Sequence, residues 1–79
     1  MSAATRPKHV VLDERIGSHI RDYRTMSGLS QNALATALGI SHQQLQKYET
    51  GTNRISASRL WHCAEVLGVR ITDFFEPPE

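Results

Sequence analysis

The chain has 79 residues, a formal net charge of +1 and 39% hydrophobic residues, which is the size and composition of one small globular domain. A single cysteine excludes an internal disulfide. No apolar run has the length of a transmembrane helix or of a signal-peptide core, so we expect a cytoplasmic protein. Residues 1–12 are expected to form a flexible N-terminal arm, residues 13–76 the folded domain, and residues 77–79 a short tail.

Apolar residues recur at helical spacing between turn signals, and this pattern predicts five short helices. Asp13 can cap the first helix, and Gly28 follows its end. The second helix begins after Ser30. The stripe expected to be buried on the first helix comprises Ile16, Ile20, Tyr23 and Met26.

Two short amphipathic helices meet around Gly39, which can take the left-handed conformation that ends a helix. Ser41 has the side chain to cap the helix that follows, and Gly51 comes after its end. The small Ala35 lets the two helices cross closely. A sharp crossing closed by a short glycine-containing turn predicts a helix-turn-helix. The apolar positions of the two helices are Leu34, Ala35, Leu38, Leu45 and Tyr48.

A fourth helix is expected between Ser56 and Gly68, and a last short helix over residues 72–75. Cys63 lies in the apolar run of the fourth helix and is expected to be a small buried hydrophobe. At least one of Phe74 and Phe75 should close the core. The positions expected to face inward on the fourth helix are Leu60, Trp61, Ala64 and Leu67.

The outward face of the third predicted helix is rich in amides and carries no carboxylate. At about 100° per residue, Glu49 falls on the inward side with the apolar residues. Glutamine can bond adenine bidentately, and lysine can reach the O6 and N7 atoms of guanine. The pattern favours DNA binding over an ordinary helical hairpin, whose solvated face more often mixes Glu with Lys. This outward face holds Gln43, Gln46, Lys47 and Thr50, with His42 and Gln44 on its flanks.

From Ile16 to Leu60, and on to Val69, the chain resembles the Cro-type helix-turn-helix domain of lambda-repressor-like, or xenobiotic-response-element, transcriptional regulators. The resemblance implies an all-α, five-helix fold that binds operator DNA, usually as a dimer. The chain departs from the family at Ile55, where proline is common, and at His19, where Arg or Lys is common. The matching residues are Arg24, Gly28-Leu29-Ser30-Gln31, Leu34-Ala35, Leu38-Gly39-Ile40-Ser41, Leu45, Tyr48-Glu49, Gly51, Leu60 and Leu67-Gly68-Val69.

The candidate site residues fall into three groups. Glu49 needs a partner if it is buried, and Arg24 should supply a bidentate one, as matching residues do in related repressors. Base contacts are expected from the third helix at His42, Gln43, Gln46 and Lys47. The resemblance implies phosphate contacts at Gln31, Thr52, Asn53, Arg54 and Arg59, each of which can equally be a solvated surface group.

Charge is distributed unevenly along the chain. Between Arg15 and Arg59 there are six basic and two acidic residues, a net of +4, whereas the segment after Arg59 is acidic. The four histidines and the cysteine show no metal-ligand spacing. No phosphate-binding glycine loop and no nucleophile with a base are present. We expect neither an enzyme nor a bound cofactor, metal or small-molecule ligand.

The sequence therefore predicts a sequence-specific regulator of transcription, most simply a repressor, that is nucleoid-associated. Because one domain reads few base pairs, we expect a homodimer on an inverted-repeat operator, with the third helix in the major groove. Alternatives are an antitoxin that also autoregulates, or a protein-interaction module, which would place acidic or apolar residues on the outward face. The surplus apolar residues that suggest a dimer interface are Val66, Val69, Ile71, Phe74 and Phe75.

Overall fold

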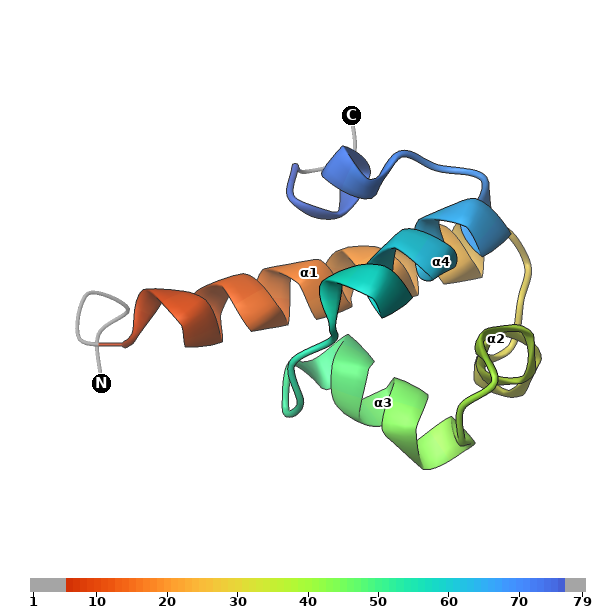
Figure 1. The fold of residues 1–79 in the computed structure, drawn as a ribbon, viewed down its shortest axis with the longest axis horizontal. Coiled ribbons are helices and arrows are strands. Elements are labelled where there is room, and N and C mark those ends of the chain that lie inside the picture. The colour runs from red at the N-terminus through yellow and green to blue at the C-terminus, as the bar shows by residue number, and fades with distance from the viewer. Residues whose placement is uncertain (1–5, 77–79) are drawn as a thin grey trace.

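The computed structural model describes residues 6–76 and folds them into four α-helices and one 3₁₀ helix. These elements are α1 (Lys8–Met26), α2 (Gln31–Leu38), α3 (His42–Thr50), α4 (Ala57–Leu67) and η2 (Ile71–Phe74). The long α1 runs through the molecule with α4 beside it, α2 and α3 lie on one side of this pair, and η2 lies on the other (Figure 1). The all-α prediction is confirmed, and the last predicted helix is the 3₁₀ turn η2.

Serine hydroxyls begin three of the helices, as the sequence predicts. Ser30, Ser41 and Ser56 each accept a hydrogen bond from the backbone N–H three residues later, at 3.0, 3.0 and 3.2 Å. Gly39 follows α2 with a φ of 70°, the left-handed conformation that closes the turn into α3. The turn between α2 and α3 therefore has the local geometry that was expected.

The first helix is longer than predicted. It begins at Lys8, with Pro7 at the N-cap position, because the fixed φ of proline suits a helix start. Residues 8–12, expected to belong to a flexible arm, are therefore helical. Asp13 does not cap the helix, and its carboxylate instead accepts a hydrogen bond from Arg54. Residues 1–5 of the predicted arm and the predicted tail at 77–79 lie outside the described residues.

The hydrophobic core lies where the helices converge. The ring of Phe74 packs edge-on against that of Tyr23, with centroids 6.0 Å apart, so η2 closes the core over α1. Burial, with a smaller effect of the Glu49 charge, raises the pKa of the Cys63 thiol to about 12. A thiol that stays protonated is a poor nucleophile, so the cysteine is structural. The largest fully buried side chains are Phe74, Ile20, Leu34, Leu45 and Cys63.

Two apolar residues expected to face inward are exposed. Met26, near the end of α1, is 72% exposed, and Trp61 on α4 is 56% exposed. The inner face of α4 is already filled by Leu60 and Cys63. Trp61 is rotated by about 100° from Leu60 around the helix, and this rotation carries it out of the core. A large indole is thus left on the surface.

His19 is a core residue and not a surface cation. Its side chain is buried, and Nδ1 lies 2.6 Å from the backbone oxygen of Phe74. Since a carbonyl oxygen only accepts, Nδ1 carries the proton and donates. This hydrogen bond ties α1 to η2 across a large separation in sequence.

The backbones of α1 and α3 lie in close contact at Gly17. A Cβ atom at this position would lie 2.1 Å from the backbone oxygen of Tyr48 and 2.7 Å from that of Glu49. No side chain fits between the two backbones here. The absence of one at Gly17 therefore fixes how the end of α3 rests on α1.

Replacing Gly17 by alanine tests this contact. At an open helical position the change would stabilise the helix by about 1 kcal/mol. Here we expect the free energy of unfolding to fall by about 1–3 kcal/mol, because the new methyl group overlaps the α3 backbone. Denaturant unfolding measures the change, with Ser18→Ala at the exposed neighbouring position as the control, expected within about 0.5 kcal/mol of the wild type. A stabilised Gly17→Ala protein would contradict the packing.

Candidate nucleic-acid interface

The helix α3 presents one face to solvent and buries the other. Leu45, Tyr48 and Glu49 are buried, and Gln44 is half-buried on the flank. The structure therefore divides the helix between core and solvent as the periodicity predicted. The exposed residues of the helix are His42, Gln43, Gln46, Lys47 and Thr50, with no carboxylate among them.

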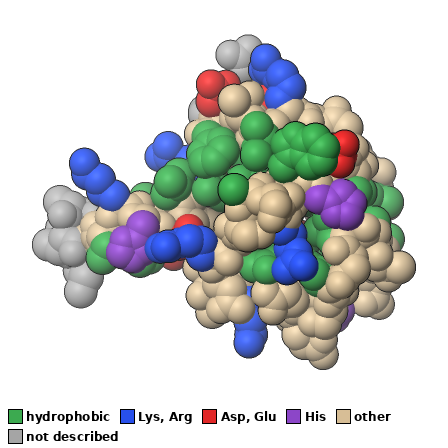
Figure 2. All heavy atoms as spheres, in the orientation of Figure 1, with side chains coloured by type: hydrophobic (Ala, Val, Ile, Leu, Met, Phe, Trp, Pro, Cys, Tyr) green, Lys and Arg blue, Asp and Glu red, His purple; other side chains and the backbone are tan. Residues whose placement is uncertain are grey.

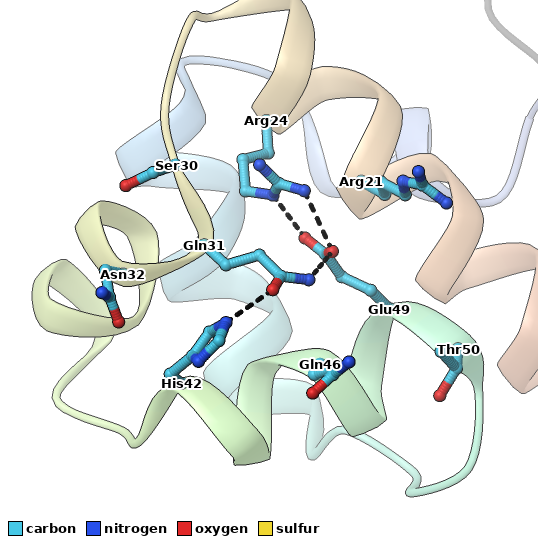
Figure 3. A pocket seen from close by; sticks show the side chains of 9 residues that line it. All are labelled: Arg21, Arg24, Ser30, Gln31, Asn32, His42, Gln46, Glu49 and Thr50. Carbon is cyan, nitrogen blue, oxygen red and sulfur yellow. Dashed lines mark hydrogen bonds and ion pairs between the residues drawn. The ribbon is translucent and has the colours of Figure 1, made fainter.

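A chain of four side chains runs behind this face from α1 to the start of α3 (Figure 3). Arg24 donates from Nε to Glu49 Oε2 at 2.6 Å and from Nη2 to Glu49 Oε1 at 3.2 Å. Gln31 Nε2 donates to the same Oε1 at 2.8 Å, and Gln31 Oε1 lies 2.7 Å from His42 Nε2. The ion pair predicted from the sequence is thus present, and hydrogen bonds through Gln31 connect it to His42 on the exposed face of α3.

The ion pair is deeply buried. The exposed fraction is 9% for the Arg24 side chain and 2% for that of Glu49. Arg24 Nη1 also donates to the backbone oxygen of Leu29 at 2.8 Å. Within residues 6–76, no buried side-chain nitrogen or oxygen lacks a hydrogen-bond partner. A fully satisfied buried pair of this kind holds its helices in one arrangement.

An open polar cleft of about 540 Å³ lies between the C-terminal part of α1, the start of α2 and one side of α3. The first residues of α2 line it, and the start of a helix is where unpaired backbone N–H groups and the positive end of the helix dipole lie. Sequence reasoning missed Arg21 and Asn32 as site residues, although Arg21 precedes Arg24 by three positions and so shares its helix face. The lining residues, labelled in Figure 3, are Arg21, Arg24, Ser30, Gln31, Asn32, His42, Gln46, Glu49 and Thr50.

Two arginines predicted to contact phosphate already have partners in this DNA-free protein. Arg54 Nε donates to Asp13 at 3.3 Å, although the arginine side chain is 62% exposed. Arg59 Nη1 donates to the hydroxyl of Tyr48 at 3.3 Å. Burial of the phenol acts to raise its pKa, but hydrogen bonds from Arg59 and Gln44 and the arginine charge outweigh it and lower the pKa of Tyr48.

The loop after α3 holds the other residues predicted to contact phosphate, Thr52 and Asn53, beside this helix. The Thr52 hydroxyl lies 2.8 Å from that of Thr50, and the Asn53 N–H donates to the backbone oxygen of Lys47 at 3.2 Å. Thr52 and Asn53 are therefore held against the end of α3. In residues 6–76, no helix has the length and apolarity to cross a membrane, and no three metal-ligating side chains gather at one point.

Residues 20–74 match the helix-turn-helix family. A protein of Sinorhizobium medicae (strain WSM419), named an uncharacterized HTH-type transcriptional regulator, is 52% identical over 65 residues that make up 82% of this chain and 47% of that protein. The chain thus spans about half the length of this relative. A Rhodospirillum rubrum protein, named an uncharacterized transcriptional regulator in the ATPase CF(0) region, is 49% identical over 75 residues, covering 95% of this chain and 68% of that protein.

Among solved structures, the chain is similar to the master regulator for biofilm formation SinR, crystallised in complex with DNA. The two superpose with a TM-score of 0.71 and 27% sequence identity, and the match covers 77% of this chain and 98% of the SinR chain in that crystal structure.

The buried ion pair makes a testable contribution to stability. We expect Arg24→Ala and Glu49→Ala each to lower the free energy of unfolding by about 3–5 kcal/mol, because each leaves a buried charge without its partner. The double variant should lose less than the sum of the two, and chemical denaturation of all three proteins measures this coupling. Arg70→Ala breaks the exposed Arg70–Asp73 pair and serves as the control, with an expected loss below about 1 kcal/mol. Additive losses would show that the two residues act independently.

Proposed function

We propose that this chain, which belongs to the helix-turn-helix family, is a sequence-specific transcriptional regulator that places α3 in the major groove of double-stranded DNA. The observation that carries the proposal is the exposed face of α3, which is rich in amides and free of carboxylates, on a helix whose other face is buried. The names of the relatives and the DNA complex of SinR support it. The role is one of binding and not of catalysis.

Base reading falls to the exposed side chains of α3. Gln43 and Lys47 lie one helical turn apart, so both can enter the groove together. The amide of Gln43 can bond an adenine bidentately, and Lys47 can reach the O6 and N7 atoms of guanine. His42 and Gln46 lie beside this pair on α3, and both line the cleft between α1, α2 and α3.

Phosphate contacts follow from the groups on both sides of α3. On the side of α2, the cleft offers the side chains of Arg21 and Asn32. The first backbone N–H groups of α2, including that of Gln31, can bond a phosphate as well. On the other side, Arg54 and Arg59 can exchange their exposed or half-exposed hydrogen bonds for phosphate at little cost. Thr52 and Asn53, in the loop after α3, would contact phosphate on the same side as Arg54 and Arg59.

Assembly as a homodimer would double a small recognition surface. Figure 2 shows hydrophobic side chains gathered where α4 and η2 lie. Trp61 and Phe75 are 56% and 39% exposed, and Val66, Val69 and Ile71 are half-buried. A two-fold pairing through this surface would present two copies of α3 to half-sites about one helical turn apart, roughly 34 Å. Such a dimer on an inverted-repeat operator acts most simply as a repressor in the cytoplasm, associated with the nucleoid.

Two substitutions separate base reading from phosphate contact. Gln43→Ala should weaken binding to the preferred site by about 1–3 kcal/mol and relax the preference at one base pair. Arg54→Ala should weaken all sequences alike and reduce the salt dependence, because it removes a phosphate contact. Arg15→Ala removes the same charge at an exposed position of α1 that does not line the cleft, and it serves as the control. Selection of bound sites from random DNA gives the base preference, and titration at several salt concentrations gives the affinity and its salt dependence. Unchanged binding of the preferred site by Gln43→Ala would contradict the docking of α3.

Trp61→Arg tests the proposed dimer. We expect sedimentation to show a dimer for the wild-type protein or its DNA complex and a monomer for this variant, because the charge disrupts an apolar interface. Met26→Arg, which changes another exposed apolar residue at the end of α1, should leave the dimer intact. A single wild-type protomer bound to a lone half-site at full affinity would contradict the dimer.

A further inference from the structure

The hydrogen-bond chain from α1 to the start of α3 has a fixed direction, because an ionised carboxylate only accepts hydrogen bonds. Glu49 receives Arg24 on one side, so Gln31 must present its amide nitrogen to Glu49 Oε1 at 2.8 Å. The carbonyl oxygen of Gln31 then faces His42 Nε2 at 2.7 Å. Since this oxygen also only accepts, His42 Nε2 carries a proton and donates it. The buried carboxylate thereby sets the tautomer of an exposed imidazole.

This assignment leaves Nδ1 as the ring nitrogen of His42 available to DNA. The side chain is exposed at the first position of α3, and Nδ1 makes no hydrogen bond to any residue between 6 and 76. In the neutral ring Nδ1 is an acceptor, and in the protonated ring it is a donor. The bond from Nε2 to Gln31 is the same in both states. One proton can therefore reverse the hydrogen-bonding character of this group while the ring keeps its place.

We propose that His42 reads a base in a proton-dependent manner, and that Gln31 is the positioning residue that makes this possible. With a neutral ring, Nδ1 selects an exocyclic amino group, which adenine carries at N6 and cytosine at N4. With a protonated ring, the same atom selects an acceptor, such as O6 or N7 of guanine or O4 of thymine. This inference rests on the proposed placement of α3 in the major groove.

The charged groups around His42 come from two helices. Arg21 and Arg24 of α1 and Glu49 of α3 line the same cleft, whereas α2 contributes only the uncharged Ser30, Gln31 and Asn32. Arg24 and Glu49 are paired with each other, and Arg21 forms no ion pair within residues 6–76. DNA phosphate is the additional charge that enters this environment on binding. Histidine side chains ordinarily change charge between about pH 5 and pH 8, which is the range to examine.

The test compares operators that differ only at the base pair read by His42, identified as the position where His42→Ala loses discrimination. Fluorescence anisotropy measures Kd for each operator at about pH 5.5 and about pH 8, with ionic strength held constant. At the lower pH we expect the preference to shift by roughly fivefold or more from cytosine to guanine or thymine on the contacted strand, whereas adenine, which carries both an amino group and the N7 acceptor, should change less. A ratio of two dissociation constants cancels the general strengthening of binding that a positive charge brings.

Two variants distinguish the proposed role from a structural one. His42→Gln keeps hydrogen-bonding capacity but does not titrate, so its base preference should be the same at both pH values. Gln31→Ala removes the acceptor that holds the proton on Nε2, and we expect it to reduce discrimination at that base pair at about pH 8 while other positions of the operator are still read. In NMR spectra of the DNA-free protein, an Nε2 proton signal of His42 should be visible in the wild type and lost in Gln31→Ala.

Several results would overturn the inference. These are a base preference that does not change with pH, a pH shift that persists in His42→Gln, an operator position that His42→Ala leaves fully discriminated, or a proton found on Nδ1 in the free neutral ring. If the protein still binds DNA selectively, any of these four results contradicts the inference about His42 but not the proposed function. A chain that binds no DNA selectively contradicts the proposed function instead, and the NMR measurement still decides the tautomer of His42.

Discussion

The arrangement of the first three helices depends on one buried carboxylate. An isolated carboxylate is costly to remove from water, so Glu49, with a side chain only 2% exposed, must be paired wherever α3 packs. Arg24 from α1 and Gln31 from α2 both donate to it. Apolar contacts alone would permit α3 to slide or rotate by small amounts, whereas three hydrogen bonds of fixed direction favour one position. The orientation of the helix-turn-helix follows from this requirement.

Backbone contacts complete the restraint on α3. Gly17 lies against the carbonyl groups at the end of α3, and a Cβ at Gly51 would lie 2.7 Å from the Cα of Glu14. Gly51 also has a φ of 78°, which a side chain would strain. At two positions where the end of α3 meets α1, the backbones therefore leave no room for a side chain. A recognition helix held in this way keeps its exposed face in place before any ligand arrives, which lowers the cost of binding.

The same network joins the stability of the domain to its exposed surface. Gln31 contacts Glu49 on its buried side and His42 on its exposed side, so the buried ion pair is connected by hydrogen bonds to the exposed face of α3. The arginines at the other end of the surface behave differently. The hydrogen bonds of Arg54 and Arg59 are long, at 3.3 Å each, and so are weaker than those that hold Glu49.

The sequence by itself determined the features that depend on neighbours along the chain. The serine caps, the turn at Gly39 and the division of α3 into buried and exposed faces follow from local hydrogen bonds and helical periodicity. The inward position of Glu49 predicted that its carboxylate needs a partner, and the resemblance to related repressors identified that partner as Arg24.

Only the tertiary structure decided which distant residues face each other. It showed that Asp13 pairs with Arg54 in place of capping α1. It also showed that Trp61 is exposed, because Leu60 and Cys63 occupy the buried face of α4. It also joined the half-buried Gln31 to the exposed His42, a contact between the starts of two helices that no periodicity encodes. These outcomes depend on how whole helices pack, and that packing is set by the sum of contacts over the core and not by any one segment of sequence.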